Sequence, residues 1–311
     1  MNKKPNILVV GSVNMDLLLM TSRLPKPGET MFSEKYFFNP GGKGGNQVVA
    51  ASLLGGKSTF AGKVGNDSFA DTLRKTLHEN GVNTDFLSVS QTHPSGFAAI
   101  MLEENGQNRI IVHPAANSDL SKADMDQAFR RDYDGMIVQF EIPEEIVIYA
   151  CNKANEKGIP AIVDAGPTLA FPLEKIHGIE ILSPNETETA FMSRVELRDE
   201  NDYKKAAQIL AKRSGAKYVV LKLAEKGACI YSKGEIKIIP TYKVKAIDST
   251  AAGDVFTAAM TIKYLKSGDI VEAVKYANAA GALTVTKAGA QQSIPTKEEV
   301  ESFIQKAEHI F

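Results

Sequence analysis

One short stretch of the sequence combines a carboxylate with small residues that would let an anion approach the backbone. Residues 248–254 read Asp-Ser-Thr-Ala-Ala-Gly-Asp, and a run of small and apolar residues typical of a helix follows. Small residues at a helix start leave backbone N–H groups open, and the helix dipole adds to the attraction for an anion. This stretch therefore predicts an anion hole.

Asp254 ends this stretch and would stand beside the bound anion. A carboxylate there would repel a phosphate, unless its role is to take a proton from the nucleophile that attacks the phosphate. Asp254 therefore fits a general base, a role worth about 10²–10⁴-fold in rate. The alternative is an Asp that only stabilises a helix N-terminus, which leaves the preceding Ala-Ala-Gly unexplained.

A glycine-rich segment at 39–47, Asn-Pro-Gly-Gly-Lys-Gly-Gly-Asn-Gln, precedes a predicted helix. Glycines at this density indicate positive φ angles or close approach of a ligand to the backbone. The segment is not a Walker A loop, because no Ser or Thr follows the lysine and the spacing differs. The Gly42 amide, Lys43 and Asn46 would suit a small polyhydroxylated substrate, and a purely structural turn is the alternative.

Polar residues also follow the ends of predicted strands, where open α/β sheets place their ligands. Asn14 and Asp16 follow the first strand, and Glu141 follows a later one. A carboxylate accepts from two adjacent hydroxyls while an amide both donates and accepts, so the first two residues suit a diol. Each residue alone could simply cap a loop.

Asn185 and Glu188 follow another predicted strand in Ser-Pro-Asn-Glu-Thr-Glu. If Asn185 caps a helix, Glu188 lies one turn later and could help to hold hydrated Mg²⁺ near phosphates. An ordinary helix cap with Glu188 near the third helical position explains the pattern equally well.

Alternating strand and helix patterns must position these residues, and they predict a mostly parallel sheet covered by helices on both faces. The predicted strands lie at 6–13, 135–140, 159–163, 179–182 and 218–223. The predicted helices lie at 46–54, 69–80, 143–157, 203–214, 253–267 and 270–287, with a last helix from Thr296 onward.

Two segments interrupt this alternation. Residues 17–39 read as strand, turn and strand, and residues 97–113 read as a hairpin with a tight turn at Asn105-Gly106. Both follow a core strand, so their strands could pair into a small sheet that forms a lid over the end of the domain. The predicted lid covers about 16–40 and 96–115 within a single domain of residues 1–311. The alternative is that these strands extend the edge of the main sheet.

Composition limits the class of protein. The formal net charge of −1 gives no overall basic field, so nucleic-acid binding is not indicated. The apolar run near the N-terminus reaches Asp16 too soon for a signal peptide or spanning helix, so we expect a cytoplasmic protein without membrane contact. Cys151 and Cys229 lack metal-ligand spacing and are expected to be buried free thiols.

These stretches resemble the motifs of the ribokinase family of sugar kinases, which includes adenosine kinase and fructokinase. The similarity spans nearly the whole chain, and the two outer motifs together are highly specific, whereas Asn-x-x-Glu alone is weak. The matching stretches are Gly-Ser-Val-Asn-Met-Asp at 11–16, Gly-Gly-Lys-Gly-Gly-Asn-Gln at 41–47, Asn-Glu-Thr-Glu at 185–188 and Asp-Ser-Thr-Ala-Ala-Gly-Asp at 248–254.

The resemblance implies a Rossmann-like three-layer α/β/α domain with a β-sheet lid, which often also forms the interface of a homodimer. It implies that Asp254 is the base, with an anion hole formed by Ala251, Ala252 and Gly253. The residues implied in sugar binding are Asn14, Asp16, Gly42, Lys43, Asn46, Glu141 and Asp254. Those implied at the ATP site are Asn185, Lys222, Leu223, Ala224, Glu225, Lys226, Gly227, Gly253 and Asn278.

Ribokinases are also activated by a monovalent cation, usually K⁺, beside the anion hole. Asp248 and Ser293 would offer side chains to it and the other matching residues would offer backbone carbonyls. Such an ion would act by fixing the loop that builds the hole. The matching positions are Asp248, Thr250, Thr284, Lys287, Gly289 and Ser293.

The sequence departs from the family at two places. Lys222-Leu-Ala stands where relatives commonly have Thr-Leu-Gly, and Asp164-Ala-Gly-Pro stands where ribokinases commonly have Asn-Pro-Ala-Pro. Both departures lie near the nucleotide end of the predicted site, and the residues implied in sugar binding are all present.

The function that the resemblance implies is ATP- and Mg²⁺-dependent phosphorylation of D-ribose at its 5-hydroxyl. A kinase for 2-deoxyribose, another sugar or a nucleoside is the nearest alternative, although the Asn14 and Asp16 pair favours a free sugar with adjacent hydroxyls. The choice of sugar depends on lid side chains such as Ala98 and Ile110. A non-catalytic sugar or nucleotide sensor would have lost its base, and Asp254 is present. A Rossmann dehydrogenase would need Gly-x-Gly-x-x-Gly after the first strand, which the sequence lacks.

Overall fold

Runs of apolar, largely β-branched residues form the centre of the main sheet. The structure, a computed structural model, describes residues 4–104 and 107–308. Strands β8 (Gly135–Gln139) and β9 (Ala161–Asp164) are buried along their whole length, as expected for strands covered on both faces. The other strands of this sheet are β1 (Asn6–Val10), β4 (Lys57–Val64), β5 (Asn83–Val89), β10 (Ile179–Ser183), β11 (Tyr218–Lys222), β12 (Ala228–Ser232) and β13 (Glu235–Ile239).

Within the described residues the main sheet has nine strands in the order β13-β12-β11-β10-β9-β8-β1-β4-β5. Pairing is parallel from β11 to β5, and β12 and β13 add an antiparallel hairpin at one edge. The carboxyl ends of the parallel strands therefore meet at one edge of the sheet, where ligands of open α/β sheets bind.

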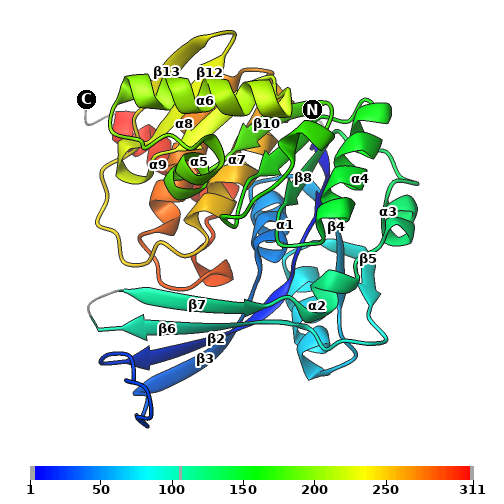
Figure 1. Cartoon of the computed structure of the whole chain (residues 1–311), viewed down its shortest axis with the longest axis vertical. Coiled ribbons are helices and arrows are strands. Elements are labelled where there is room, and N and C mark those ends of the chain that lie inside the picture. Colours follow the sequence, from blue (N-terminus) through cyan, green and yellow to red (C-terminus); the bar gives the residue numbers. More distant parts are fainter. Residues whose placement is uncertain (1–3, 105–106, 309–311) are drawn as a thin grey trace.

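Helices cover both faces of this sheet, which confirms the three-layer prediction (Figure 1). Along β1, Ile7 and Val9 point into one hydrophobic core, and Leu8 and Val10 point into the other. The first core is built with α1 (Lys43–Leu53), α2 (Ser68–Glu79), α7 (Ala252–Ser267), α8 (Ile270–Thr284) and α9 (Lys297–Glu308). The second is built with α3 (Lys122–Ala128), α4 (Glu144–Glu156), α5 (Glu186–Ser193) and α6 (Glu200–Ser214).

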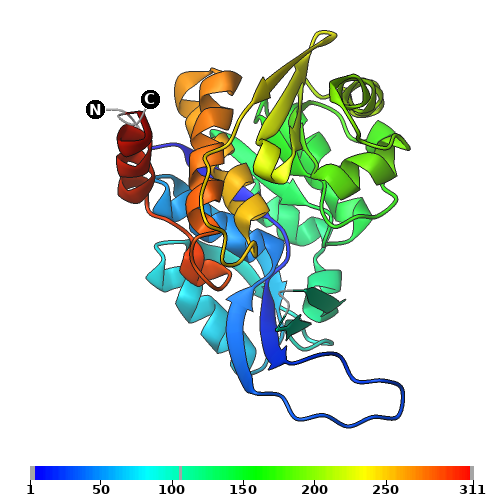
Figure 2. The same ribbon diagram turned by 90° about the vertical axis from the view of Figure 1, so that its left-hand side faces the viewer.

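The two interrupting segments form a separate sheet, so they do not extend the main one. Its strands are β3 (Lys35–Gly41), β2 (Asn14–Thr21), β6 (Gly96–Glu103) and β7 (Asn108–His113), in that order. Figure 1 shows this small sheet projecting from one end of the main domain, and Figure 2 shows the long β2–β3 connection extending away from it. The turn predicted at residues 105–106 lies outside the described residues.

The observed boundaries differ from the predicted ones where glycine and polar residues dominate. Strand β1 ends at Val10, and the chain re-enters a strand at Asn14, so 11–13 connect the two sheets. Helix α1 begins at Lys43, which places the glycines of 44–45 inside its first turn. Helix α8 ends at Thr284 rather than Lys287. None of the helices in the described ranges has the length and apolar character needed to cross a membrane.

Candidate active site

Asp254 lies in the first turn of α7, where two side chains of α1 hold its carboxylate. Asn46 Nδ2 donates to Oδ2 at 2.9 Å, and Gln47 Nε2 donates to Oδ1 at 3.1 Å. Lys43 Nζ lies 3.8 Å from Oδ1. The structure therefore brings the predicted base together with Lys43 and Asn46, and it adds Gln47.

Burial and charge set the protonation of this group. Burial raises the pKa of Asp254 to about 6, and the positive charge of Lys43 limits the rise. Burial disfavours the charged form of Lys43, but four carboxylates, of which Asp254 is the strongest, hold its pKa above the ordinary value. A carboxylate with a raised pKa next to a fixed cation is the arrangement expected for a general base that works near neutral pH.

Asp16 and Asn46 carry unpaired acceptors close to this base. Among the described residues, Asp16 Oδ1 and Asn46 Oδ1 are buried without a hydrogen-bond partner. Burial, Glu141 and Asp254 raise the pKa of Asp16 to about 7. A buried acceptor without a partner costs free energy, and the hydroxyls of a polyol would supply the missing donors.

Asn117, in the 3₁₀ turn at Ala115–Asp119, fixes the orientation of Asn14, and no sequence pattern around it pointed to this role. Its Nδ2 donates to Asn14 Oδ1 at 2.8 Å, and its Oδ1 accepts from the Val13 amide at 3.0 Å. Asn117 is buried, so this pair is shielded from water. The Asn14 amide nitrogen is thereby turned away from Asn117.

Glu141 points into a cavity at the same edge of the sheet. Its Oε2 accepts from Ser12 Oγ at 2.6 Å and from the Lys43 amide at 3.3 Å. The cavity measures about 510 Å³ and is lined by Ser12, Asn14, Val112, Pro114, Asn117, Ser118, Phe140, Glu141, Ile142, Pro143 and Pro167. Two of the strand-end residues predicted from sequence, Asn14 and Glu141, therefore share one cavity.

Two glycines are required by close packing here. A Cβ at Gly41 would lie 2.0 Å from Asp16 Oδ2. Gly42 precedes α1 with a φ of 79°, and a Cβ there would lie 2.8 Å from the Asn14 nitrogen. The glycine-rich segment therefore lets the backbone pass directly against the two predicted diol-binding residues.

The predicted anion hole lies at the start of α7. Ala251 adopts a left-handed conformation with φ of 62°, and the Ala252 amide donates to the Ser249 carbonyl at 3.2 Å. The space over Gly253 is open, and Lys222 Nζ is its nearest described neighbour, 3.8 Å from the position of a Cβ. A lysine therefore flanks the place where the sequence predicts a bound phosphate.

Asp164 is fully buried at the end of β9. The sequence identifies it only as a departure from the family motif and assigns it no role in the site. Its Oδ1 accepts from Lys222 Nζ at 3.0 Å, and its Oδ2 accepts from Gln47 Nε2 at 2.8 Å and from Thr257 Oγ1 at 3.2 Å. Burial opposes its ionisation, but Lys222 and Lys43 hold its pKa below the ordinary value. Its place at a strand end is the signal that could have identified it.

Asn185 and Glu188 form a reciprocal helix cap at the start of α5. The Glu188 amide donates to Asn185 Oδ1 at 2.8 Å, and the Asn185 amide donates to Glu188 Oε2 at 2.7 Å. The cap that the pattern predicts is therefore formed, and Glu188 is buried. Its association with Mg²⁺ remains a prediction.

The remaining nucleotide-side residues surround the turn between β11 and β12. Leu223 is buried, and a 3₁₀ turn at Ala224–Lys226 leads to Gly227, where a Cβ would lie 2.1 Å from the Ile239 carbonyl oxygen. Asn278 Nδ2 donates to the carbonyls of Ile239 at 3.0 Å and of Pro240 at 3.1 Å. Asn278 thus anchors the end of β13 beside this turn. Glu225 and Lys226 lie exposed within it.

The stretches predicted to hold a monovalent cation meet at Asp248. Its Oδ1 accepts from the amide and hydroxyl of Thr250 at 2.9 and 2.6 Å, and its Oδ2 accepts from the Gly289 amide at 2.9 Å. These bonds tie the loop before α7 to the loop after α8. The hydroxyls of Thr284 and Ser293 donate to nearby carbonyls, and Lys287 pairs with Glu299.

The described residues contain no cluster of three or more His, Cys, Asp or Glu side chains that could hold a metal ion. Cys151 and Cys229 are buried and free, and burial raises the pKa of each thiol to about 12.

Comparison with known proteins gives a consistent result. A family model described as pfkB family carbohydrate kinase matches residues 4–297. The ribokinase of Haemophilus influenzae is 34% identical over 306 residues, covering 98% of this chain and all of that protein. A deoxyribokinase of Salmonella typhi is 31% identical over 302 residues, covering 96% of this chain and 98% of that protein.

Among solved structures, that of Arabidopsis thaliana ribokinase complexed with ribose and ATP has a TM-score of 0.88 and 31% identity. The match covers 97% of this chain and 99% of the other. Fold and sequence agree, and the chain belongs to the pfkB family of carbohydrate kinases.

Proposed function

We propose that this protein transfers the γ-phosphoryl group of ATP to the 5-hydroxyl of D-ribose, with Asp254 as general base. The observation that carries the proposal is the buried Asp254 carboxylate, held by Asn46 and Gln47 beside the unpaired acceptors of Asp16 and Asn46. Relatives named ribokinase, including one solved with ribose and ATP, support the choice of substrates.

Asp16 and Asn14 would bind adjacent hydroxyls of the sugar, and Asn46 Oδ1 would accept from another. This places the attacking hydroxyl at Asp254, which accepts its proton as the O–P bond forms. Lys43 would meet the negative charge of the transferring phosphoryl group, together with the backbone amides at the start of α7. The products are ribose 5-phosphate and ADP, and the proton is left on Asp254.

We propose that Mg²⁺ would be bound together with ATP and would supply positive charge that neutralises its phosphates. Glu188 has one oxygen outside the helix cap and remains the candidate for an outer contact with the hydrated ion. For the monovalent cation, the tie between Asp248 and Gly289 supports a site between these loops, since the same loops lead into the anion hole. We expect K⁺ to raise the rate by fixing them.

The small sheet is proposed to act as a lid that excludes water from the reaction. Ala98 pairs with Asp16 in the strand register, so their side chains lie on the same face of the small sheet. Ile110 lies two positions from Val112, the partner of Ala98, so its side chain lies on that face as well. Both Ala98 and Ile110 would therefore face the sugar. The opposite face carries exposed apolar side chains, with Tyr36, Phe38 and Ile111 exposed by 63%, 49% and 66%. This face supports a homodimer formed through the small sheet. Because ATP is the donor, we expect the protein to act in the cytoplasm.

The test is ADP release by the purified protein with ATP and Mg²⁺ over ribose, 2-deoxyribose, fructose and adenosine, each in K⁺ and in Na⁺. Strong turnover with ribose, raised by K⁺, is expected. Turnover with 2-deoxyribose but not ribose would favour the second candidate, a deoxyribokinase, which the 31% identical Salmonella relative supports. Binding of sugar or nucleotide without ADP release would favour a sensor.

A further inference from the structure

Asp164 and Lys222 form a buried ion pair at the carboxyl ends of β9 and β11. Lys222 Nζ lies 3.0 Å from Asp164 Oδ1, Asp164 is fully buried, and the Lys222 side chain is only 12% exposed. These are the two positions at which the sequence departs from the common family motifs. The structure therefore joins the two departures into a single interaction.

Gln47 connects this ion pair to the base. Its Nε2 donates to Asp164 Oδ2 at 2.8 Å and to Asp254 Oδ1 at 3.1 Å. Its Oε1 accepts from Gln139 Nε2 at 2.5 Å, which fixes the orientation of the amide. A carboxamide nitrogen has two hydrogens, so both are used and each carboxylate receives one.

We propose that Asp164 and Lys222 are positioning residues that act through Gln47 to hold the Asp254 carboxylate in its reactive orientation. The inference rests on the proposed role of Asp254 as base. Without Lys222, two buried carboxylates would share one amide, and Asp164 would lose its nearest positive charge and keep only the interaction with Lys43. Without Asp164, Gln47 would lose the acceptor that aligns it, and Lys222 would be left as a buried unpaired cation.

Charges on several elements face Asp254, and the pair contributes to their balance. Lys43 comes from α1, Asp164 from β9 and Asp16 from β2, and Glu141, which follows β8, joins them through its interaction with Asp16. Glu188 of α5 joins them through its interaction with Lys43, and Lys222 of β11 acts through Asp164. Removing the charge of Asp164 should lower the proton affinity of Asp254, and removing that of Lys222 should raise it.

Asp164→Asn keeps the shape but puts an NH₂ group toward either Gln47 or Lys222, both of which are donors. We expect kcat at saturating ATP and sugar to fall by about tenfold to a hundredfold through misplacement of the base. The KM for the sugar should stay within about twofold, because the diol contacts remain. The acid limb of the kcat–pH profile should move to lower pH.

Lys222→Met should move the acid limb in the opposite direction, to higher pH. In the double variant, the amide introduced at position 164 can turn its oxygen to Gln47 and Thr257, since no lysine competes for it. We therefore expect the double variant to recover kcat relative to Asp164→Asn and to return the acid limb close to that of the wild type. In the double variant, Gln47 would again be aligned to donate its hydrogen bond to Asp254.

A matched control is Lys217→Met, which breaks the ion pair of Lys217 and Glu180 near the opposite end of β11. It should leave both kcat and the pH profile unchanged. If the kcat losses of the two single variants multiply in the double variant and the acid limb moves in none of the three, the pair is merely structural. That result would overturn the proposal. Melting temperatures of all variants identify any that fail to fold.

A measurement without turnover separates this inference from the proposed function. Carboxyl ¹³C NMR titration of Asp254 in the nucleotide-free protein should show its pKa falling in Asp164→Asn and rising in Lys222→Met. If the wild type releases no ADP with any sugar, the proposed function fails while this titration still decides the inference. Equal Asp254 titration in all variants would refute the coupling even in an active enzyme.

Discussion

Asn46 Nδ2 lies 2.9 Å from Asp254 Oδ2, so the first turn of α1 holds the Asp254 carboxylate in the first turn of α7. Both helices begin at the same edge of the sheet, and they contribute different groups to the site. Helix α1 brings donors in a glycine-rich turn, and α7 brings the carboxylate proposed as the base. The proposed reaction site is therefore assembled between two helices whose contacting residues are 208 positions apart in sequence.

The first prediction concerns Asp254 itself. Asp254→Asn removes the proton acceptor while keeping the size of the side chain, and its amide oxygen can accept from only one of Asn46 and Gln47, so kcat should fall by about 10²–10⁴-fold. The KM for sugar should change little, because Asp16 and Asn14 remain. Steady-state ADP release measures both constants. Near-normal turnover in this variant would rule out Asp254 as the base.

The second prediction is a loss of activity on the acid side. The pKa of Asp254 is raised to about 6 and that of Asp16 to about 7, so each carboxyl stays protonated to higher pH than usual. A protonated Asp254 cannot accept a proton, and a protonated Asp16 loses acceptors for the sugar. Between pH 8 and pH 5 we expect kcat to fall by about tenfold and kcat/KM to fall more steeply. Profiles that stay flat to pH 5 would contradict these assignments.

The third prediction tests the support of Asn14 by Asn117. Asn117→Ala frees the Asn14 side chain and leaves a buried amide without its partner, so the sugar KM should rise by about tenfold. The kcat should stay within about twofold, because the base is untouched. Asn152→Ala is the matched control, since Asn152 also bridges backbone groups, those of Lys175 and His177, away from the site. A loss confined to kcat would show that Asn117 serves another role.

The fourth prediction concerns activation by a monovalent cation. Asp248→Ala removes the link between the loop before α7 and Gly289, so the wild-type difference between K⁺ and Na⁺ should disappear. The rate in K⁺ should fall to about the wild-type rate in Na⁺ or below, since the anion hole loses its fixed geometry. A variant that keeps full K⁺ activation would exclude Asp248 from the cation site.

The fifth prediction concerns assembly through the small sheet. Ile111→Glu puts a charge on the exposed apolar face, and we expect a dimer of the wild type to become a monomer at micromolar concentration in sedimentation velocity. Phe191→Glu is the control, because Phe191 is 51% exposed on α5, away from that sheet. A wild-type monomer, or a variant that still dimerises, would exclude this face as the interface.

The sequence predicted the central strands and the chemistry-bearing stretches because both depend on local patterns. Buried strands such as β8 read as apolar runs, and Asp254 and Asn46 lie in glycine- and alanine-rich turns. Strands β4 and β5 were not predicted, since Lys-Ser-Thr-Phe-Ala-Gly-Lys-Val mixes polar with apolar residues and β5 is a half-exposed edge.

Other parts of the site depend on contacts between distant segments. Asp164 meets Gln47 only because the topology puts β9 near α1, and Asn117 reaches Asn14 from a short turn without a pattern of its own. The Lys222 departure looked like an isolated change in the nucleotide turn until the structure placed it beside Asp164. Pairings of this kind cannot be deduced from one sequence.

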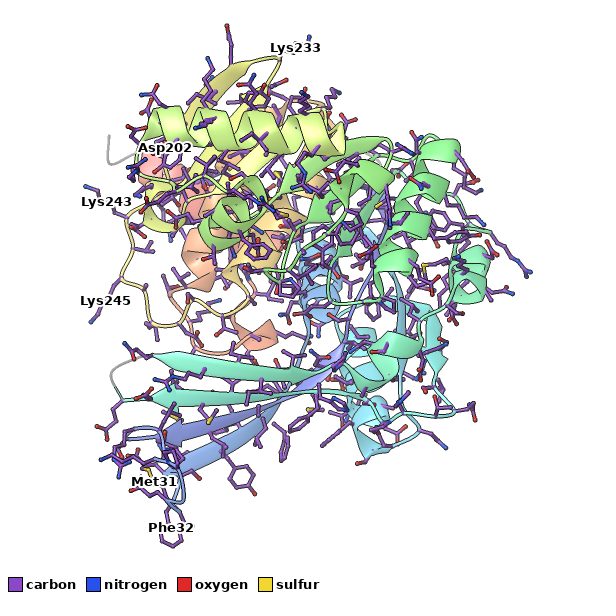
Figure 3. The ribbon with its side chains drawn as sticks, in the orientation of Figure 1. Met31, Phe32, Asp202, Lys233, Lys243 and Lys245 are labelled. Carbon is purple, nitrogen blue, oxygen red and sulfur yellow. The ribbon has the colours of Figure 1, made fainter. Side chains whose placement is uncertain are left out.

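Strand β2 follows β1 after a short connection, and Asn14 and Asp16 lie at its start. The small sheet is therefore rooted in the main domain at the two proposed sugar contacts, while the exposed Phe32 lies in the connection beyond the other end of the sheet (Figure 3). If the small sheet is the lid that we propose, it is a lever with its fulcrum at the proposed binding site. Swinging this lever would then change how easily the sugar enters and leaves while hardly moving Asn14 and Asp16, the two side chains proposed to bind it.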